Sequence, residues 1–130
     1  MPSALESIQP VLMSRDVTVS VRFYECLGFT LAFQDNPLDP RYAGVVRDRV
    51  ELHLQWQDAE QWAYPIDRPT YRLGVQDVDA LYAELQERGA LAGNANSSSP
   101  WRKPGDTPWG TREFHVQDPD GNGLQFYRAG

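Results

Sequence analysis

The stretch that decides the fold is residues 108–127, which read PWGTREFHVQDPDGNGLQFY. Its centre, DPDGNG, consists of turn residues, because proline restricts φ and glycine adopts a positive φ without a steric penalty. The segments on either side have strand character. Thr111–Gln117 alternates, with Phe114 and Val116 on one face, and Leu124–Tyr127 is rich in aromatic residues. The stretch therefore predicts a β-hairpin with a tight, glycine-containing turn.

The hairpin closes the second of two similar halves. Asp16 and Gly28 are 12 residues apart, as are Asp77 and Gly89, and the two pairs are offset by 61 residues. In each half the Asp precedes an apolar pattern of helical period and the Gly follows it, which marks the start and the end of a helix. This internal repeat indicates a duplicated module, and two such modules must pack together to bury their apolar sheet faces.

Each half is predicted to contain a strand, a helix and three further strands, so the fold class is α+β with two tandem βαβββ modules. The predicted strands are Ser7–Met13, Thr30–Gln34, Tyr42–Val46 and Val50–Trp56 in the first half, and Thr70–Val75, a weak strand at Ala90–Ala95 and the hairpin in the second. Residues 58–68 are predicted as a connector and residues 94–108 as a loop. The length of 130 residues predicts a single domain, 1–130, with modules at about 1–60 and 61–130.

The composition argues against several classes of function. The chain has 18 acidic and 12 basic residues, a net charge of −6 and no basic run, so nucleic acid is a poor partner and a cationic small molecule a good one. No run approaches the roughly 20 apolar residues of a membrane span, and the first ten residues lack the features of a secretory signal. The single cysteine, Cys26, fits a reducing cytoplasm, and its helical context predicts a buried side chain.

Several motifs in order resemble the glyoxalase/bleomycin-resistance family of the vicinal oxygen chelate superfamily, and its bleomycin-binding branch in particular. The matching residues are Pro10-Val11-Leu12 with Arg15-Asp16, Tyr42 to Asp48, Pro108-Trp109-Gly110, Arg112-Glu113-Phe114, and Asp118-Pro119 with Gly121-Asn122. The resemblance covers nearly the whole chain. It implies paired modules whose mixed sheets curve around a cleft, and a homodimer in which the N-terminal strand crosses to the partner near Pro10.

The resemblance also implies a ligand groove lined by aromatic side chains. The candidate ligand-binding residues are Phe33, Tyr42, Trp101 and Trp109, with Glu51, His53 and His115 as polar contacts. Aromatic faces stack on planar heterocycles and attract cations, with roughly 0.5–2 kcal/mol for each contact. Phe33 is equally well explained as a core residue, and Trp62 as a side chain that fills a loop.

In the metalloenzymes of this superfamily, each module supplies metal ligands from its first and last strands. The corresponding positions here are Gln9, Glu51, Thr70 and Gln125. Iron, nickel and zinc sites prefer imidazole, carboxylate or thiolate ligands, and of the four residues only Glu51 provides one. We therefore expect no metal and no cofactor, although a site built from Glu51, His53 and His115 remains an alternative.

Two functions follow from these residues. The favoured one is a dimeric protein that sequesters a bleomycin-type antibiotic, which is planar and cationic, without catalysis. The alternative is a metal-dependent lyase, isomerase or thiol transferase of the vicinal oxygen chelate superfamily. A protein of the same fold that binds an unrelated aromatic metabolite is a third possibility, because stacking tolerates many ligands.

Overall fold

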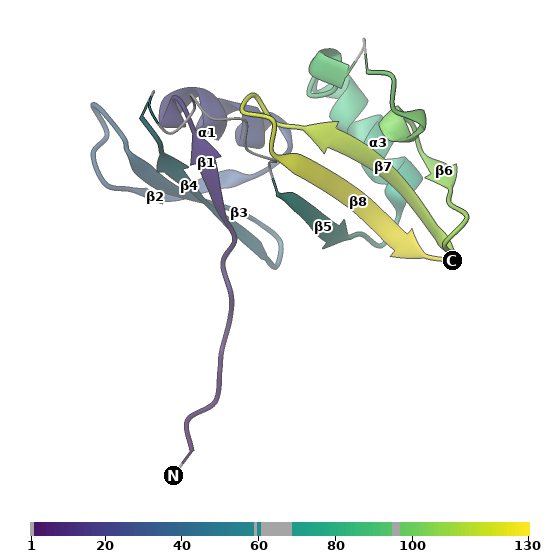
Figure 1. The fold of residues 1–130 in the computed structure, drawn as a ribbon, viewed down its shortest axis with the longest axis horizontal. Coiled ribbons are helices and arrows are strands. Elements are labelled where there is room, and N and C mark those ends of the chain that lie inside the picture. The colour runs from purple at the N-terminus through teal and green to yellow at the C-terminus, as the bar shows by residue number, and fades with distance from the viewer. Residues whose placement is uncertain (1, 59, 61–68, 95–96) are drawn as a thin grey trace.

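The computed structural model describes residues 2–58, 60, 69–94 and 97–130. It contains two four-stranded sheets that lie side by side, here called sheet A and sheet B (Figure 1). Sheet A has the order β1 (Val11–Ser14), β4 (Val50–Trp56), β3 (Tyr42–Arg47), β2 (Thr30–Gln34), and sheet B the order β5 (Thr70–Gly74), β8 (Gly123–Ala129), β7 (Thr111–Gln117), β6 (Gly105–Asp106). The helices α1 (Val17–Cys26) and α3 (Val78–Glu87) complete the two βαβββ modules, which confirms the predicted α+β fold.

The repeat unit begins and ends as predicted. The side chain of Asp16 accepts a hydrogen bond from the backbone N–H of Val19 at the start of α1, and Asp77 accepts one from Ala80 at the start of α3. Gly28 and Gly89 follow the two helices with φ of 90° and 73°, a conformation that favours glycine. The predicted caps and the predicted helix ends are therefore both confirmed.

Two predicted strands differ from the structure. The first strand begins at Val11 rather than Ser7, and the chain before it extends away from the sheet (Figure 1). Pro10 has no backbone N–H to donate to a neighbouring strand. Residues 90–94, the described part of the predicted weak strand 90–95, do not form a strand. The segment Ala92–Asn94 is a 3-10 helical turn instead, and the strand that pairs with β7 is the two-residue β6. A second 3-10 turn covers Pro100–Arg102. Most of the predicted connector, including Trp62, lies outside the described residues.

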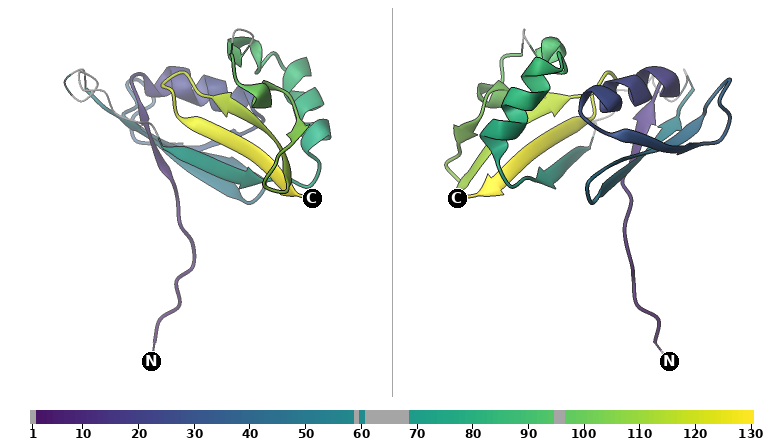
Figure 2. Two further views of the ribbon diagram at one scale, coloured as in Figure 1. Left: turned by 45° about the vertical axis from the view of Figure 1, so that its right-hand side comes forward. Right: turned by 180° about the vertical axis from the view of Figure 1, so that it is seen from behind.

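Strand alternation gives each sheet one apolar and one polar face. Leu52 and Leu54 of β4 are buried and α1 packs against this strand, whereas Glu51 and His53 lie on the opposite face. Sheet B follows the same rule, since α3 packs against β7 and β8. Both helices lie on one side of the sheets, as the view from behind shows (Figure 2). The opposite side, here called the open face, carries no helix among the described residues.

The tip of the β7–β8 hairpin ties the second module to helix α1 of the first. The buried carboxylate of Asp118 accepts hydrogen bonds from the Tyr24 hydroxyl at 2.9 Å and from the Asn122 side chain at 2.8 Å. Asp120 accepts bonds from the Ser20 hydroxyl and from the backbone N–H of Arg15. Burial raises the pKa of the Asp118 carboxyl, and the hydrogen bonds from Asn122 and Tyr24 oppose that rise.

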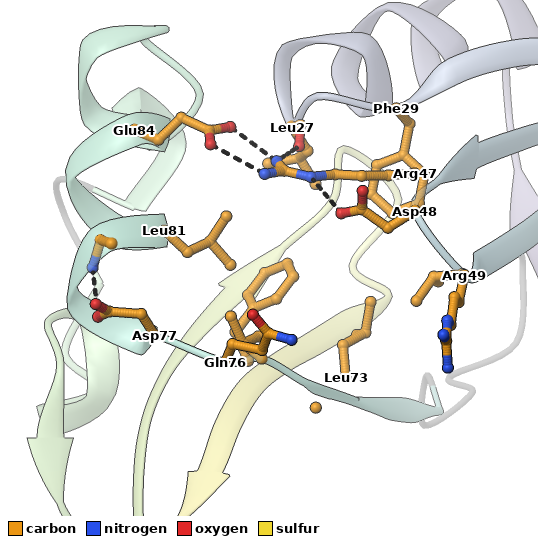
Figure 3. Close-up of a pocket in the computed structure, with 15 residues that line it drawn as sticks. Leu27, Phe29, Arg47, Asp48, Arg49, Leu73, Gln76, Asp77, Leu81 and Glu84 are labelled. Atoms are coloured by element: carbon orange, nitrogen blue, oxygen red, sulfur yellow. Dashed lines mark hydrogen bonds and ion pairs between the residues drawn. The ribbon is translucent and has the colours of Figure 1, made fainter.

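A second contact between the modules lies on the helix side, beside a cavity of about 600 Å³ (Figure 3). Arg47 of β3 donates to both carboxylate oxygens of Glu84 in α3, at 2.8 and 2.9 Å, and to the backbone carbonyl of Leu27 at 2.6 Å. These hydrogen bonds hold the pKa of Glu84 below its usual value. The ionised groups that line this cavity therefore include a pair that bridges the two modules.

The position of the single cysteine differs from the prediction. Cys26 is exposed at the end of α1, so the prediction of a buried thiol was wrong. The apolar stripe of α1 runs through Val17, Val21 and Tyr24 instead.

Among the described residues, no helix has both the length and the apolar character needed to cross a membrane.

We expect Tyr24→Phe to lower the free energy of unfolding by about 2 kcal/mol, because it removes a hydrogen bond to a buried carboxylate without changing the packed ring. Urea denaturation measures this loss. Tyr82→Phe is the matched control, since the Tyr82 hydroxyl makes only an exposed contact of 3.4 Å with Gln86. Equal stability of the wild type and the Tyr24 variant would show that the hairpin tip does not depend on this bond.

Candidate functional site

Four of the predicted site residues form one cluster on the open face of sheet A. The ring of Phe33 stacks on Tyr42 with centroids 6.2 Å apart and meets His53 edge-on at 5.2 Å. Tyr42 and His53 also contact each other, with centroids 5.4 Å apart, and His53 bonds to Glu51. We call this group the A cluster. Its Phe33 side chain is 44% exposed, which resolves the earlier alternative in favour of a surface residue.

The backbone of sheet A explains why Phe33 reaches the open face. The pairing of β2 with β3 shifts between Leu31 and Phe33, so that Leu31 lies opposite Val45 and Phe33 lies opposite Gly44. Such a bulge adds one residue to a strand and redirects the side chains that follow. The ring then covers Gly44, where an added Cβ would lie 2.2 Å from a ring carbon of Phe33. Glycine at this position is therefore required by the close approach of the ring.

The polar atoms of the A cluster form a directed chain of hydrogen bonds. The Nε2 of His53 lies 2.7 Å from a carboxylate oxygen of Glu51, and because a carboxylate only accepts, this nitrogen carries the proton. The Nδ1 of a neutral ring then accepts from the Tyr42 hydroxyl at 2.7 Å. The chain fixes the orientation of both rings, and it also has the order of groups that acid–base chemistry uses.

The remaining three predicted residues form a second cluster on the open face of sheet B. The rings of Trp101 and Trp109 meet at 5.6 Å with an angle of 68°, and Trp101 also contacts His115 at 6.2 Å. We call this group the B cluster. Trp109 is 58% exposed and follows Pro108 at the entrance to β7, while Trp101 lies in the 3-10 turn and covers Gly105.

Beneath the B cluster lies a carboxylate that the sequence analysis did not assign. Glu113 is 0% exposed and accepts hydrogen bonds from the Trp109 indole at 3.0 Å, from Arg72, from the Thr111 hydroxyl and from His115. Burial alone would raise the pKa of Glu113, but these donors outweigh it and lower the pKa to about 2. The carboxylate is therefore ionised at any pH at which the protein is ordinarily handled.

Arg72 is the cation that pairs with this buried charge. Its guanidinium donates to Glu113 at 3.2 Å and to the side-chain oxygen of Gln125 at 2.6 Å, and it lies 4.2 Å above the ring of Tyr127. The sequence could have placed Glu113 on this face, because strand alternation puts it between Thr111 and His115 on the same side of β7. The pairing with Arg72 depends on the neighbouring strands and carries no sequence signal.

The donor set at the four metal-ligand positions does not fit a transition metal. Glu51 supplies a carboxylate, but Gln9, Thr70 and Gln125 supply neutral oxygens. The guanidinium of Arg72 already occupies the position beside Gln125, and its positive charge disfavours a metal cation there. Across the described ranges, no group of three or more His, Cys, Asp or Glu side chains is placed to hold a metal ion. In particular, His53 lies in the A cluster and His115 in the B cluster.

The structure thus collects the predicted residues into two groups on separate sheets. The A cluster contains Phe33, Tyr42, Glu51 and His53, and the B cluster contains Trp101, Trp109 and His115. Both open faces combine exposed aromatic rings with a His–Glu pair in which the two residues are separated by one position. The cavity in Figure 3 is a different feature, because apolar side chains from the helix side of the sheets, such as Leu73 and Phe126, line it.

Several relatives and solved structures match nearly the whole of this chain. A bleomycin resistance protein from Geobacillus stearothermophilus is 27% identical over 95% of this chain and 96% of its own. A bleomycin-binding protein from Streptomyces verticillus, solved in complex with copper(II)-bleomycin, is 32% identical, covers 99% of each chain and superposes with a TM-score of 0.74. A bleomycin resistance determinant encoded on the transposon Tn5 shares the fold, with a TM-score of 0.74, 24% identity and coverage of 96% of this chain and 98% of its own.

The family model described as "Glyoxalase/Bleomycin resistance protein/Dioxygenase superfamily" matches residues 7–126. That range includes the first βαβββ module, the second module as far as Phe126 in β8, and every residue of the A and B clusters. The match and the shared fold together confirm the resemblance that the motifs indicated. The chain therefore belongs to the glyoxalase/bleomycin resistance protein/dioxygenase superfamily.

Proposed function

We propose that this protein binds a bleomycin-type antibiotic reversibly and sequesters it without chemical change. The observation that carries the proposal is the likeness, along the full length of both chains, to a bleomycin-binding protein solved with copper(II)-bleomycin. The relative from Geobacillus stearothermophilus is a bleomycin resistance protein, which is consistent with the same role. The seven residues of the A and B clusters are the proposed ligand-binding residues.

The chemistry of the open faces suits a planar and cationic ligand. Phe33 and Trp109 are 44% and 58% exposed, so their rings are available to stack on a heterocycle. A positive charge on the ligand is attracted to such rings and to the carboxylate of Glu51, whose side chain is 40% exposed. The net charge of −6 acts in the same direction at longer range.

A second copy of the chain is proposed to complete the groove. Residues 2–10 extend away from the body of the protein, and Leu5 and Ile8 in this arm are 101% and 89% exposed (Figure 1). β1 pairs with the half of β4 from His53 to Trp56, so the preceding half of β4 has an edge at which another strand can add. Exchange of the arms would cover this edge and the exposed apolar side chains in both protomers.

The absence of catalysis is also part of the proposal. The donor set at the metal-ligand positions disfavours the metal-dependent reactions of the superfamily, because Gln9, Thr70 and Gln125 are neutral donors. The hydrogen-bond chain from Tyr42 to Glu51 orients two rings of the groove, which is sufficient reason for its presence. Recovery of chemically unaltered drug after binding and release tests this part directly.

We expect Trp109→Ala to weaken bleomycin binding by about 30-fold, because truncation of an aromatic anchor typically costs at least 2 kcal/mol. Titration of the drug against the protein, followed by tryptophan fluorescence, measures the affinity. Trp56→Ala is the matched control and should bind as the wild type does. Strand alternation puts Trp56 on the same face of β4 as Leu52 and Leu54, which is opposite to the open face, and its ring contacts Arg41. If the wild type shows no saturable change at micromolar drug, the proposed function is wrong for this ligand.

We expect the double variant Leu5→Glu, Ile8→Glu to be a monomer and the wild type a dimer of about twice the 14.8 kDa chain mass. Two charges in the arm would have to be buried in the exchanged state, which opposes association. Sedimentation velocity at micromolar concentration distinguishes the two masses. Leu38→Glu is the control, because Leu38 is 95% exposed in a loop far from the arm in the sequence. A monomeric wild type would show that no groove forms between two protomers.

A further inference from the structure

We infer that Glu113 is a positioning residue of the ligand site: its buried carboxylate holds the ring of Trp109 in the orientation that receives the ligand. The inference rests on the proposed function for its effect on affinity, but the effect on Trp109 itself can be measured without any ligand. Glu113 is 0% exposed, so it acts through its neighbours rather than by touching the drug.

The ring of Trp109 has few other restraints. Its neighbours Pro108 and Gly110 are exposed, Gly110 has a φ of 92°, and an added Cβ on Gly110 would meet no atom within 4 Å. An exposed side chain on such a turn would ordinarily sample several rotamers. Two contacts select one rotamer. The indole N–H donates to Glu113 at 3.0 Å, and the ring packs edge-on against Trp101 with the two centroids 5.6 Å apart.

The carboxylate that receives this bond is itself fixed. Arg72 approaches both of its oxygens, at 3.2 and 3.4 Å, and Thr111 and His115 donate to one oxygen each. Because all of these partners lie on strands of sheet B, or directly beside them, they connect the position of Trp109 to the rigid part of the sheet. Pre-ordering a contact residue lowers the entropy that is lost when the ligand binds.

The A cluster orders its aromatic rings without a buried carboxylate. Phe33 is held by the bulge in β2 and by its contact with Gly44, and the carboxylate of Glu51 is partly exposed and bonds to His53. Phe33 on sheet A is therefore ordered by packing, whereas Trp109 on sheet B is ordered by its bond to a buried charge. Replacement of Glu113 should disturb the B cluster and leave the A cluster unchanged.

The test compares Glu113→Gln, Trp109→Phe and the variant that carries both. Glu84→Gln is the matched control, because it also takes a carboxylate away from an arginine, Arg47, on the helix side of the sheets. Near-ultraviolet circular dichroism of the free protein reports the contact of the two indoles, and fluorescence titration reports the affinity for bleomycin. The part of the dichroism that Trp109→Phe removes defines the signal of the Trp101–Trp109 pair.

We expect Glu113→Gln to lose most of that signal and to bind bleomycin about tenfold more weakly, because an amide oxygen is a weaker acceptor than a carboxylate and the amide NH2 group cannot accept from Arg72 or His115. The change should add little to the loss caused by Trp109→Phe, since it weakens the bond that Trp109→Phe removes. Glu84→Gln should keep the signal and the affinity. An unchanged signal in Glu113→Gln, or losses of affinity that add fully in the double variant, would overturn the inference.

A failure of the proposed function, or of a variant to fold, can be distinguished from a failure of the inference. If wild-type protein binds no bleomycin, the proposed function fails, and the dichroism of the free variants still decides whether Glu113 positions Trp109. If Glu113→Gln does not fold because Arg72 is left unpaired, Glu113→Asp replaces it. Aspartate keeps the negative charge but is shorter by about one carbon–carbon bond, roughly 1.5 Å, so it should also reduce the signal. A full signal in this variant counts against the inference.

Discussion

The buried carboxylate of Asp118 is the constraint on which the arrangement of the two modules depends. It receives the Tyr24 hydroxyl from helix α1 and the Asn122 side chain from its own turn, in a site where water is excluded. An ionised group in such a place is strongly unfavourable without these donors, so the hairpin tip and the helix must keep one relative position. This position in turn fixes the angle between the open faces of sheets A and B, which carry all seven proposed ligand contacts.

The two open faces reach similar surfaces by different physical means. On sheet A, a strand bulge and a glycine allow Phe33 to lie flat, and a chain of hydrogen bonds that ends on Glu51 orients Tyr42 and His53. On sheet B, an ion pair between Glu113 and Arg72 lies beneath the tryptophans. The duplicated module therefore conserves its backbone plan between the halves while the side chains on the two faces have diverged. Two different surfaces can then contact two different parts of one ligand.

Arg72 has a second consequence for function. In the metalloenzymes of the superfamily both modules supply metal ligands, whereas here a guanidinium beside one of the corresponding positions supplies a fixed positive charge. It bonds to Gln125, one of the four positions considered for metal ligands, and it neutralises Glu113. The same residue thus opposes metal binding and stabilises the aromatic surface of sheet B.

The repeat, the helix ends and the hairpin could be predicted from the residues alone, because they depend on local signals: Asp16 and Asp77 as caps, Gly28 and Gly89 as helix stops, and the DPDGNG turn. The sequence also placed Phe33, Tyr42, Glu51, His53 and His115 on their strands, since alternation is a local property, and Trp101 in a loop. Only the tertiary structure decided that they form two clusters and that Glu113 is buried beneath one of them. The short β6, the position of Arg72 and the exposure of Phe33 depend on which strands pair and in which register, and such long-range contacts have no counterpart in the local pattern of residues.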